Sequence, residues 1–155
     1  MKKVIKQPKP KHLLLNPLLL IKHFVINNGE KSHLRCHKLL YFAYKKAILK
    51  YNTFLFEEEF EAWKYGPVLR SYYFFFRTFQ EDENYEKLEK YLIKKIPENS
   101  LGLETCLGDS FSVKNLLDAV SKEYNNMDTV NLIDLSHDNY WDKADLKIKQ
   151  FFFVN

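Results

Sequence analysis

The sequence predicts a mainly α-helical fold, a compact helical domain of about five to six helices with one small antiparallel β-hairpin. Hydrophobic residues make up 46% of the 155 residues and aromatic residues 16%, which is enough apolar surface for a core and excludes a disordered chain. Several windows repeat their apolar residues at steps of three and four, the spacing of one helix face. Capping residues and prolines mark where those windows begin and end.

The N-terminus differs in charge from the rest of the chain. The first eleven residues hold five lysines and no acid, and the whole chain has a net charge of +4, so the basic excess belongs to this segment. We therefore predict a basic flexible tail over residues 1–15 and a single helical domain over residues 16–155. Two cysteines exclude a disulfide scaffold, and no apolar run is long enough to span a membrane. We expect a cytoplasmic protein with no membrane partner.

The first two helices are predicted from their ends. Pro17 suits the first turn of a helix that ends at Asn28-Gly29, and Ser32 is a suitable N-cap for the next helix. The second helix has the clearest apolar periodicity of the chain, and Asn52 breaks it. Its apolar stripe consists of Leu40, Ala43, Tyr44, Ala47, Ile48 and Tyr51.

A change of pattern after this helix predicts the hairpin. Residues 54–63 hold two short apolar runs around three glutamates, which indicates two strands joined by an acidic turn. We expect Gly66-Pro67 to form the junction with a third helix, with proline in its first turn. Aromatic residues from Tyr72 to Phe76 make this helix apolar on nearly every side, so it lies in the centre of the core or at an interface.

The following part of the chain has the weakest pattern. A helix over about residues 84–95 is expected, because apolar residues recur on one side of it. Pro97 ends this helix. Residues 98–109 are expected to form a loop or an irregular hairpin.

Two more helices are predicted near the C-terminus. The first begins at Val113 after a cap at Ser110 or Ser112. The second is short, runs from about Thr129 to His137 and is capped by the preceding aspartate. The alternating pattern over residues 142–154 fits either a strand or a short terminal helix.

No catalytic or cofactor-binding motif stands out. The chain has four glycines, none of them in a phosphate-binding pattern. His33, Cys36 and His37 have a spacing that could hold a metal, but they also continue the apolar stripe of the second helix, and we favour packing. The glutamates of residues 57–61 and His137 offer acid–base groups, and nothing in the sequence brings them together. We expect a non-enzymatic protein without cofactor or metal, and an enzyme built on these residues is the least favoured hypothesis.

Three segments carry motifs in a distinctive order. Residues 34–43 read LRCHKLLYFA, residues 61–68 read EAWKYGPV after Leu55-Phe56, and Leu135-Ser136-His137 is followed four residues later by Trp141. Together they resemble the Panacea domain, the SocA-like antitoxin family, whose members are often called phage-associated proteins. The resemblance extends over about residues 17–150. It departs from the family pattern at the second-helix cysteine and histidine, where leucine and glutamine are usual.

The resemblance implies both a fold and a function. Panacea domains are mainly helical and have a small hairpin that carries the Trp-Lys-Tyr-Gly-Pro segment. They act as antitoxins in two-gene toxin–antitoxin systems, where they bind a toxin directly, and some act as proteolytic adaptors that pass the toxin to a cellular protease. We therefore expect a cognate toxin protein as partner, with a cellular protease as a second candidate. The candidate partner-binding or family-motif residues are Lys38, Tyr41, Trp63, Lys64, Tyr65, Gly66, Pro67, Tyr72, Tyr73, His137 and Trp141.

A nucleic-acid-associated regulator that uses the basic tail is the alternative hypothesis. Outside the first eleven residues, acidic and basic side chains are nearly equal in number, so nucleic acid is the less favoured partner. This hypothesis predicts DNA binding that weakens steeply with salt and is lost when residues 1–11 are removed.

Overall fold

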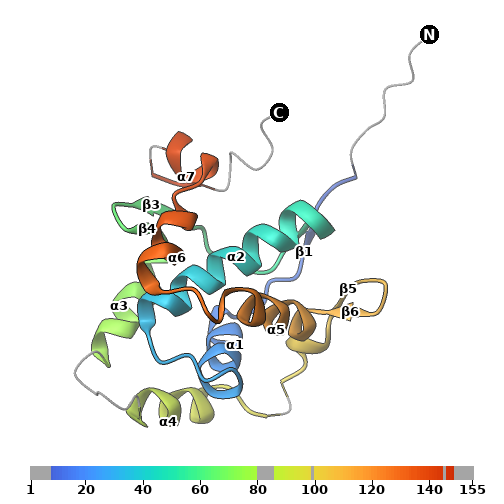
Figure 1. The fold of residues 1–155 in the computed structure, drawn as a ribbon. Helices are drawn as coiled ribbons and strands as arrows, with labels where there is room; N and C mark the ends of the chain where they lie inside the picture. Colours follow the sequence, from blue (N-terminus) through green and yellow to red (C-terminus); the bar gives the residue numbers. More distant parts are fainter. Residues whose placement is uncertain (1–7, 80–85, 99, 145, 149–155) are drawn as a thin grey trace.

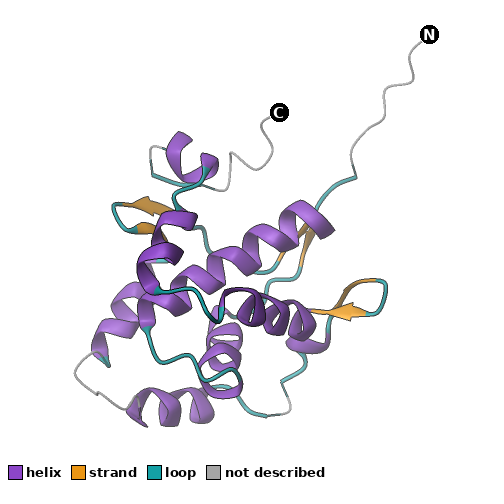
Figure 2. Cartoon of the chain, in the orientation of Figure 1, coloured by secondary structure: helices purple, strands orange, loops and turns teal. Residues whose placement is uncertain are grey.

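Helices make up most of the structure (Figures 1 and 2). The computed structural model describes residues 8–79, 86–98, 100–144 and 146–148. Within these residues the helices are α1 (Pro17–Lys22), the π-helical η1 (His23–Asn27), α2 (His33–Tyr51), α3 (Arg70–Thr78), α4 (Glu86–Lys95), the 3-10 turn η2 (Gly102–Glu104), α5 (Val113–Tyr124), α6 (Thr129–Ser136) and α7 (Asn139–Lys143). The strands are β1 (Lys11–His12), β2 (Thr53–Phe54), β3 (Glu61–Trp63), β4 (Gly66–Val68), β5 (Cys106–Gly108) and β6 (Phe111–Ser112).

The mainly helical prediction is confirmed in outline. All six expected helices are present, and the described residues contain a seventh, α7. The side chain of Asp138 accepts a hydrogen bond from the backbone N–H of Trp141 and so caps α7. This cap separates α7 from α6, and the sequence pattern did not resolve the two.

Helix α2 passes through the middle of the fold and contacts α1, α5, α6 and strand β4 (Figure 1). Ser32 caps its start, and Asn52 ends it in a left-handed conformation with φ of 48°. Both ends were predicted. Leu40, Ala43 and Tyr44 are at most 1% exposed, so this helix is the framework on which the other elements are placed.

The hairpin is not where the residue pattern placed it. Strand β3 pairs with β4 in an antiparallel hairpin, whereas β2 pairs in parallel with β1. Gly66 and Pro67 therefore belong to the second strand, and α3 begins only at Arg70. The prediction was wrong because residues 54–56 and Phe60 are all at most 1% exposed. A segment that buries every side chain does not form a hairpin with one face in solvent.

The N-terminal segment joins the body earlier than expected. Leu13 donates a backbone hydrogen bond to Phe54 (3.0 Å), and Leu15 donates one to Leu55 (2.9 Å). These bonds extend the β1–β2 pairing, so the predicted tail over residues 1–15 is too long at its C-terminal end. Residues 1–7 lie outside the described residues.

The C-terminal part agrees with most of the expected boundaries. Ser112 caps α5 with a reciprocal capping box, and Asp128 caps α6. Residues 98–109 were expected to form a loop or an irregular hairpin, and an irregular hairpin, β5–β6, begins near the end of this segment. Lys147 forms a β-bridge with Glu61, so the chain returns to β3 after α7. The remaining residues of the ambiguous 142–154 segment, from 149 onward, lie outside the described residues.

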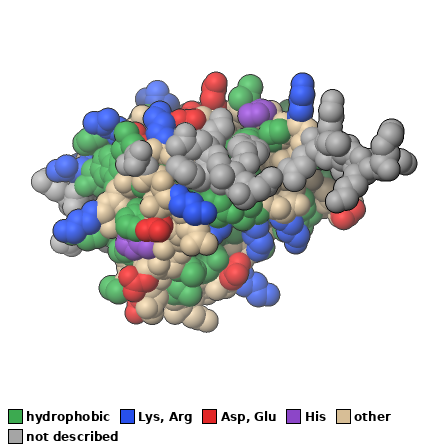
Figure 3. All heavy atoms as spheres, turned by 90° about the horizontal axis from the view of Figure 1, so that it is seen from above, with side chains coloured by type: hydrophobic (Ala, Val, Ile, Leu, Met, Phe, Trp, Pro, Cys, Tyr) green, Lys and Arg blue, Asp and Glu red, His purple; other side chains and the backbone are tan. Residues whose placement is uncertain are grey.

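No helix among the described residues has the length and apolar character needed to cross a membrane. The face seen from above in Figure 3 carries basic and acidic side chains, with hydrophobic side chains between them.

Candidate functional site

The three motif segments of the sequence meet in space. Strand β4 contacts both α2 and α6, and the α6–α7 connection lies against the β3–β4 turn (Figure 1). We call this meeting point the polar junction. It consists of the β3–β4 hairpin and the side chains Lys38, Tyr41, His137, Asp138 and Trp141.

Lys38 is the most unusual member of the polar junction, because its side chain is fully buried. Its Nζ donates a hydrogen bond to the carbonyl oxygen of Pro67 at 3.1 Å. Burial lowers the pKa of Lys38 to about 8, since the charged form loses its hydration. Lys38 therefore connects the central helix to the second strand of the hairpin.

Gly66 makes this close approach possible. Its φ is +104°, and a Cβ there would lie 2.4 Å from Ser136 Oγ and 2.8 Å from Lys38 Nζ. Any other residue would be strained and would also collide with its neighbours. Glycine is thus required where hairpin, α2 and α6 converge, a different role from the predicted junction between hairpin and helix.

The α6–α7 connection holds the hairpin turn through backbone carbonyls. His137 Nε2 donates to Lys64 O at 2.9 Å, and Trp141 Nε1 donates to Trp63 O at 2.7 Å. The rings of His137 and Trp141 pack with centroids 4.2 Å apart. The two residues belong to different helices, because His137 is the C-cap of α6 and Trp141 lies in α7.

Asp138 links α7 to the central helix. Its Oδ2 accepts hydrogen bonds from Tyr41 Oη and Lys45 Nζ, both at 2.8 Å, while its Oδ1 caps α7. Burial, together with this carboxylate, raises the pKa of Tyr41. Neither Asp138 nor Lys45 was among the predicted residues. The aspartate ahead of Asn-Tyr-Trp is an N-cap signal that could have identified the first of them.

Comparison with known proteins decides the family. The profile described as "Antitoxin SocA-like, Panacea domain" matches residues 37–142, which is more than half of the chain. The chain belongs to the SocA-like antitoxin, Panacea-domain family. No curated protein and no solved structure matched the chain.

Most of the motif residues of this Panacea domain fall into two groups. In the first, polar atoms are used inside the fold, as described for Lys38, Tyr41, His137 and Trp141. The second group lies toward the solvent on the β3–β4 turn and on α3. It consists of Trp63, Lys64, Tyr65 and Tyr73. Of the remaining motif residues, Tyr72 packs against the core, and Gly66 and Pro67 are buried.

The aromatic residues of the second group form a partly exposed surface together with Phe74. We define this aromatic surface as Trp63, Tyr65, Tyr73 and Phe74. The rings of Trp63 and Tyr73 lie 5.1 Å apart, and those of Tyr73 and Phe74 lie 5.5 Å apart. Tyr65 is 61% exposed and Phe74 50%. Trp63 Nε1 donates to Glu61 Oε1 at 2.9 Å, which orients the indole ring.

Basic side chains accompany these rings. The Arg77 guanidinium lies 6.0 Å from the centre of the Tyr73 ring, and Lys64 Nζ lies 5.5 Å from that of Tyr65. Such cation–π contacts hold the rings without burying them. Phe76 is the one fully buried residue of α3. This helix is therefore not central in the core, which was one of the two predicted positions.

The possible metal ligands on α2 are used for packing. His37 is buried and packs edge-on against Phe76, with ring centroids 5.4 Å apart. Burial lowers its pKa to about 3 and raises the pKa of the Cys36 thiol. Within the described part of the chain, no three His, Cys, Asp or Glu side chains are grouped as metal ligands.

Proposed function

We propose that this protein neutralises a partner toxin by direct contact and acts without catalysis of its own. The family gives the antitoxin-like role. The observation that supports direct contact is the aromatic surface, where four large side chains lie partly in solvent on a rigidly held hairpin and its neighbouring helix. All four lie within the matched region.

Aromatic side chains suit this role for a physical reason. Tyrosine and tryptophan bury a large area in a partner while losing little conformational freedom, and they are enriched among residues that dominate binding energy. The hydrogen bonds to the carbonyls of Trp63 and Lys64 hold the hairpin in place before a partner arrives. Preorganisation of this kind reduces the entropic cost of association.

The test uses the full chain and the products of its neighbouring genes. Each product is expressed alone and together with this protein, and cell growth is measured. The double variant Tyr65→Ala/Phe74→Ala should lose protection and weaken toxin binding by roughly 30-fold or more, the effect of about 2 kcal/mol at an interface.

Leu101→Ala is the matched control. Leu101 is 78% exposed and lies outside the aromatic surface, so this variant should protect as the wild type does. Protection that survives Tyr65→Ala/Phe74→Ala would remove the aromatic surface as the contact site. If no neighbouring gene product is toxic alone and neutralised by this protein, the antitoxin function is contradicted.

The proteolytic-adaptor form of this function makes a separate prediction. If the toxin is handed to a protease, its steady-state amount falls when this protein is present, and it recovers in cells that lack the protease. If neutralisation is by binding alone, the amount of toxin stays constant or rises while growth is restored.

A further inference from the structure

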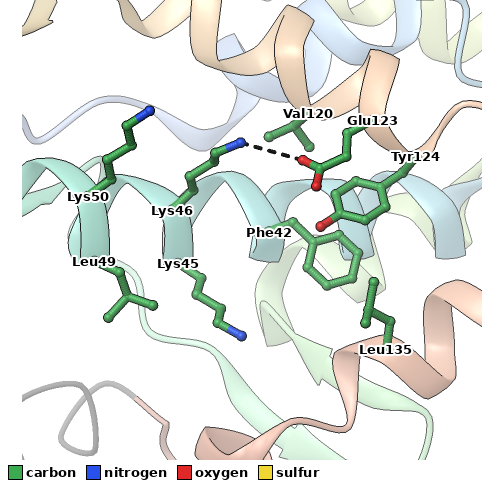
Figure 4. A pocket seen from close by; sticks show the side chains of 9 residues that line it. All are labelled: Phe42, Lys45, Lys46, Leu49, Lys50, Val120, Glu123, Tyr124 and Leu135. Atoms are coloured by element: carbon green, nitrogen blue, oxygen red, sulfur yellow. Dashed lines mark hydrogen bonds and ion pairs between the residues drawn. The ribbon is translucent and has the colours of Figure 1, made fainter.

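A groove between α2, α5 and α6 has no part in the function proposed above. Its volume is about 480 Å³, which lies within the roughly 300–1,000 Å³ of typical ligand sites. Figure 4 shows its lining: α2 supplies one wall, α5 another, and Leu135 of α6 closes one end. None of the residues of the aromatic surface lines it.

The floor of the groove is apolar. The rings of Phe42 and Tyr124 lie 4.5 Å apart and form its base with the buried Val120. Leu49 from α2 and Leu135 from α6 are 52% and 45% exposed. An apolar side chain placed between them would remove this surface from water, which favours binding.

The rim of the groove is basic. Lys46 and Lys50 lie one turn apart on α2 and point toward α5, and Lys45 lies on the other side of the helix (Figure 4). The lining contains a single acid, Glu123, whose Oε2 is 3.4 Å from Lys46 Nζ.

The lysines of the rim differ in the contacts that they already make. The Lys46–Glu123 pair has side chains 38% and 52% exposed. Exposed pairs of this kind contribute little to stability, so an incoming carboxylate can replace Glu123. Lys45, by contrast, is bound to Asp138 in the polar junction. Lys50 Nζ lies 5.5 Å from the centre of the Tyr51 ring, a cation–π contact that is weak at an exposed site. Lys46 and Lys50 are thus the two cations of the lining that a ligand can recruit.

We propose that this groove binds an acidic amphipathic segment of a partner protein. Apolar side chains of the segment occupy the space between Leu49 and Leu135, and its carboxylates pair with Lys46 and Lys50. The wall from Phe42 to Lys50 is about 12 Å long at the rise of a helix, which matches two turns of a bound helix. Charge complementarity selects an acidic segment, and the apolar floor disfavours nucleic acid.

The test is a selection followed by a binding measurement. A phage-displayed library of random peptides is selected on the folded full-length protein, and the enriched peptides are synthesised with a fluorescent label. We expect enriched sequences to combine acidic and apolar residues. Their affinity, measured by fluorescence anisotropy, should fall about tenfold or more in Lys46→Glu/Lys50→Glu and also in Leu49→Glu.

Lys122→Glu and Phe74→Ala are the controls. Lys122 is exposed on α5 but does not line the groove, so reversing its charge should change the affinity less than about twofold. Phe74→Ala should leave peptide binding intact, which separates this site from the aromatic surface. Circular dichroism checks that each variant is folded. Enrichment of non-acidic peptides, or an equal loss of affinity in Lys122→Glu, would overturn the proposal.

Discussion

The polar junction and the aromatic surface share the β3–β4 hairpin but differ in how their side chains are used. In the polar junction, the polar atoms of Lys38 and Asp138 form hydrogen bonds within the chain. In the aromatic surface, Tyr65 and Phe74 expose at least half of their area. The two sets of residues thus serve two purposes. The junction holds the hairpin in one position, and the surface is what a partner can reach.

The largest effect is expected where the junction is most crowded. Gly66→Ala introduces a Cβ 2.4 Å from Ser136 Oγ at a φ of +104°. Backbone strain of ~1–2 kcal/mol and overpacking of ~1–3 kcal/mol should together reduce the free energy of unfolding by about 2–5 kcal/mol. Urea denaturation measures this loss.

Gly29→Ala is the control for that variant. Gly29 also has a positive φ, +71°, but no atom lies within 4 Å of the added Cβ. This variant should lose only the strain contribution, about 1–2 kcal/mol. Equal losses of unfolding free energy in both variants would show that crowding in the polar junction does not destabilise the fold.

A somewhat smaller loss is expected at the carboxylate of the junction. Asp138→Ala leaves Tyr41 Oη and Lys45 Nζ without their acceptor and removes the cap of α7. We expect the free energy of unfolding to fall by about 2–4 kcal/mol. Asp128→Ala removes the cap of α6. This change should lower the free energy of unfolding by only about 1 kcal/mol. Thermal and urea unfolding of both variants test whether Asp138 acts as more than a cap.

The buried lysine predicts a pH dependence of stability. Its pKa is about 8 in the fold, against 10.5 for an ordinary lysine. Between these values the unfolded chain binds more protons, so the contribution of Lys38 to the free energy of unfolding rises with pH. From about pH 7.5 to about pH 9.5 this rise should be about 1–2 kcal/mol. Below pH 8 the cost of burying the charge is fully present.

Lys38→Met isolates that contribution. Cys36, Tyr41 and Tyr44 have raised pKa values, so they lower stability as pH rises, and they do so in both proteins. The difference in unfolding free energy between wild type and Lys38→Met therefore reports on Lys38 alone. A difference that stays constant from pH 7.5 to 9.5 would show that the lysine keeps an ordinary pKa.

The smallest effect on stability is expected in the aromatic surface. Phe74→Ala removes a ring that is 50% exposed and should change the free energy of unfolding by less than about 0.5 kcal/mol. Phe76→Ala, two residues along the same helix, removes a ring that is 1% exposed and should cost about 3–5 kcal/mol. Similar losses of unfolding free energy in the two variants would mean that the aromatic surface is part of the core. The distinction between the polar junction and the aromatic surface would then be wrong.

Local signals in the sequence were enough to predict six helices, but they missed α7 and placed the start of α3 too early. Ser32, Asn52 and Ser112 each act within a few residues of the helix end that they mark. The strand pairing was harder to predict, because the phenylalanines before Phe60 are buried on both sides and carry no alternation. The family resemblance did place the hairpin correctly at the Trp-Lys-Tyr-Gly-Pro segment.

The contacts of the polar junction could not be predicted in detail from periodicity. Tyr41 and Asp138 are separated by 97 positions in the sequence, and His137 and Lys64 by 73. No local pattern reports which distant carbonyl a histidine will reach. The motif residues identified the right segments, but the division into internal and exposed side chains required the structure.

The return of the chain to β3 has a consequence for synthesis in the cell. Ala62 donates a backbone hydrogen bond to Leu146, and Ile148 donates one to Phe60. These contacts to the hairpin form only after residues 146–148 have left the ribosome. A nascent or C-terminally truncated chain has the central helix but lacks the contacts that set the hairpin. Premature termination would therefore produce a protein whose aromatic side chains are present but not yet arranged.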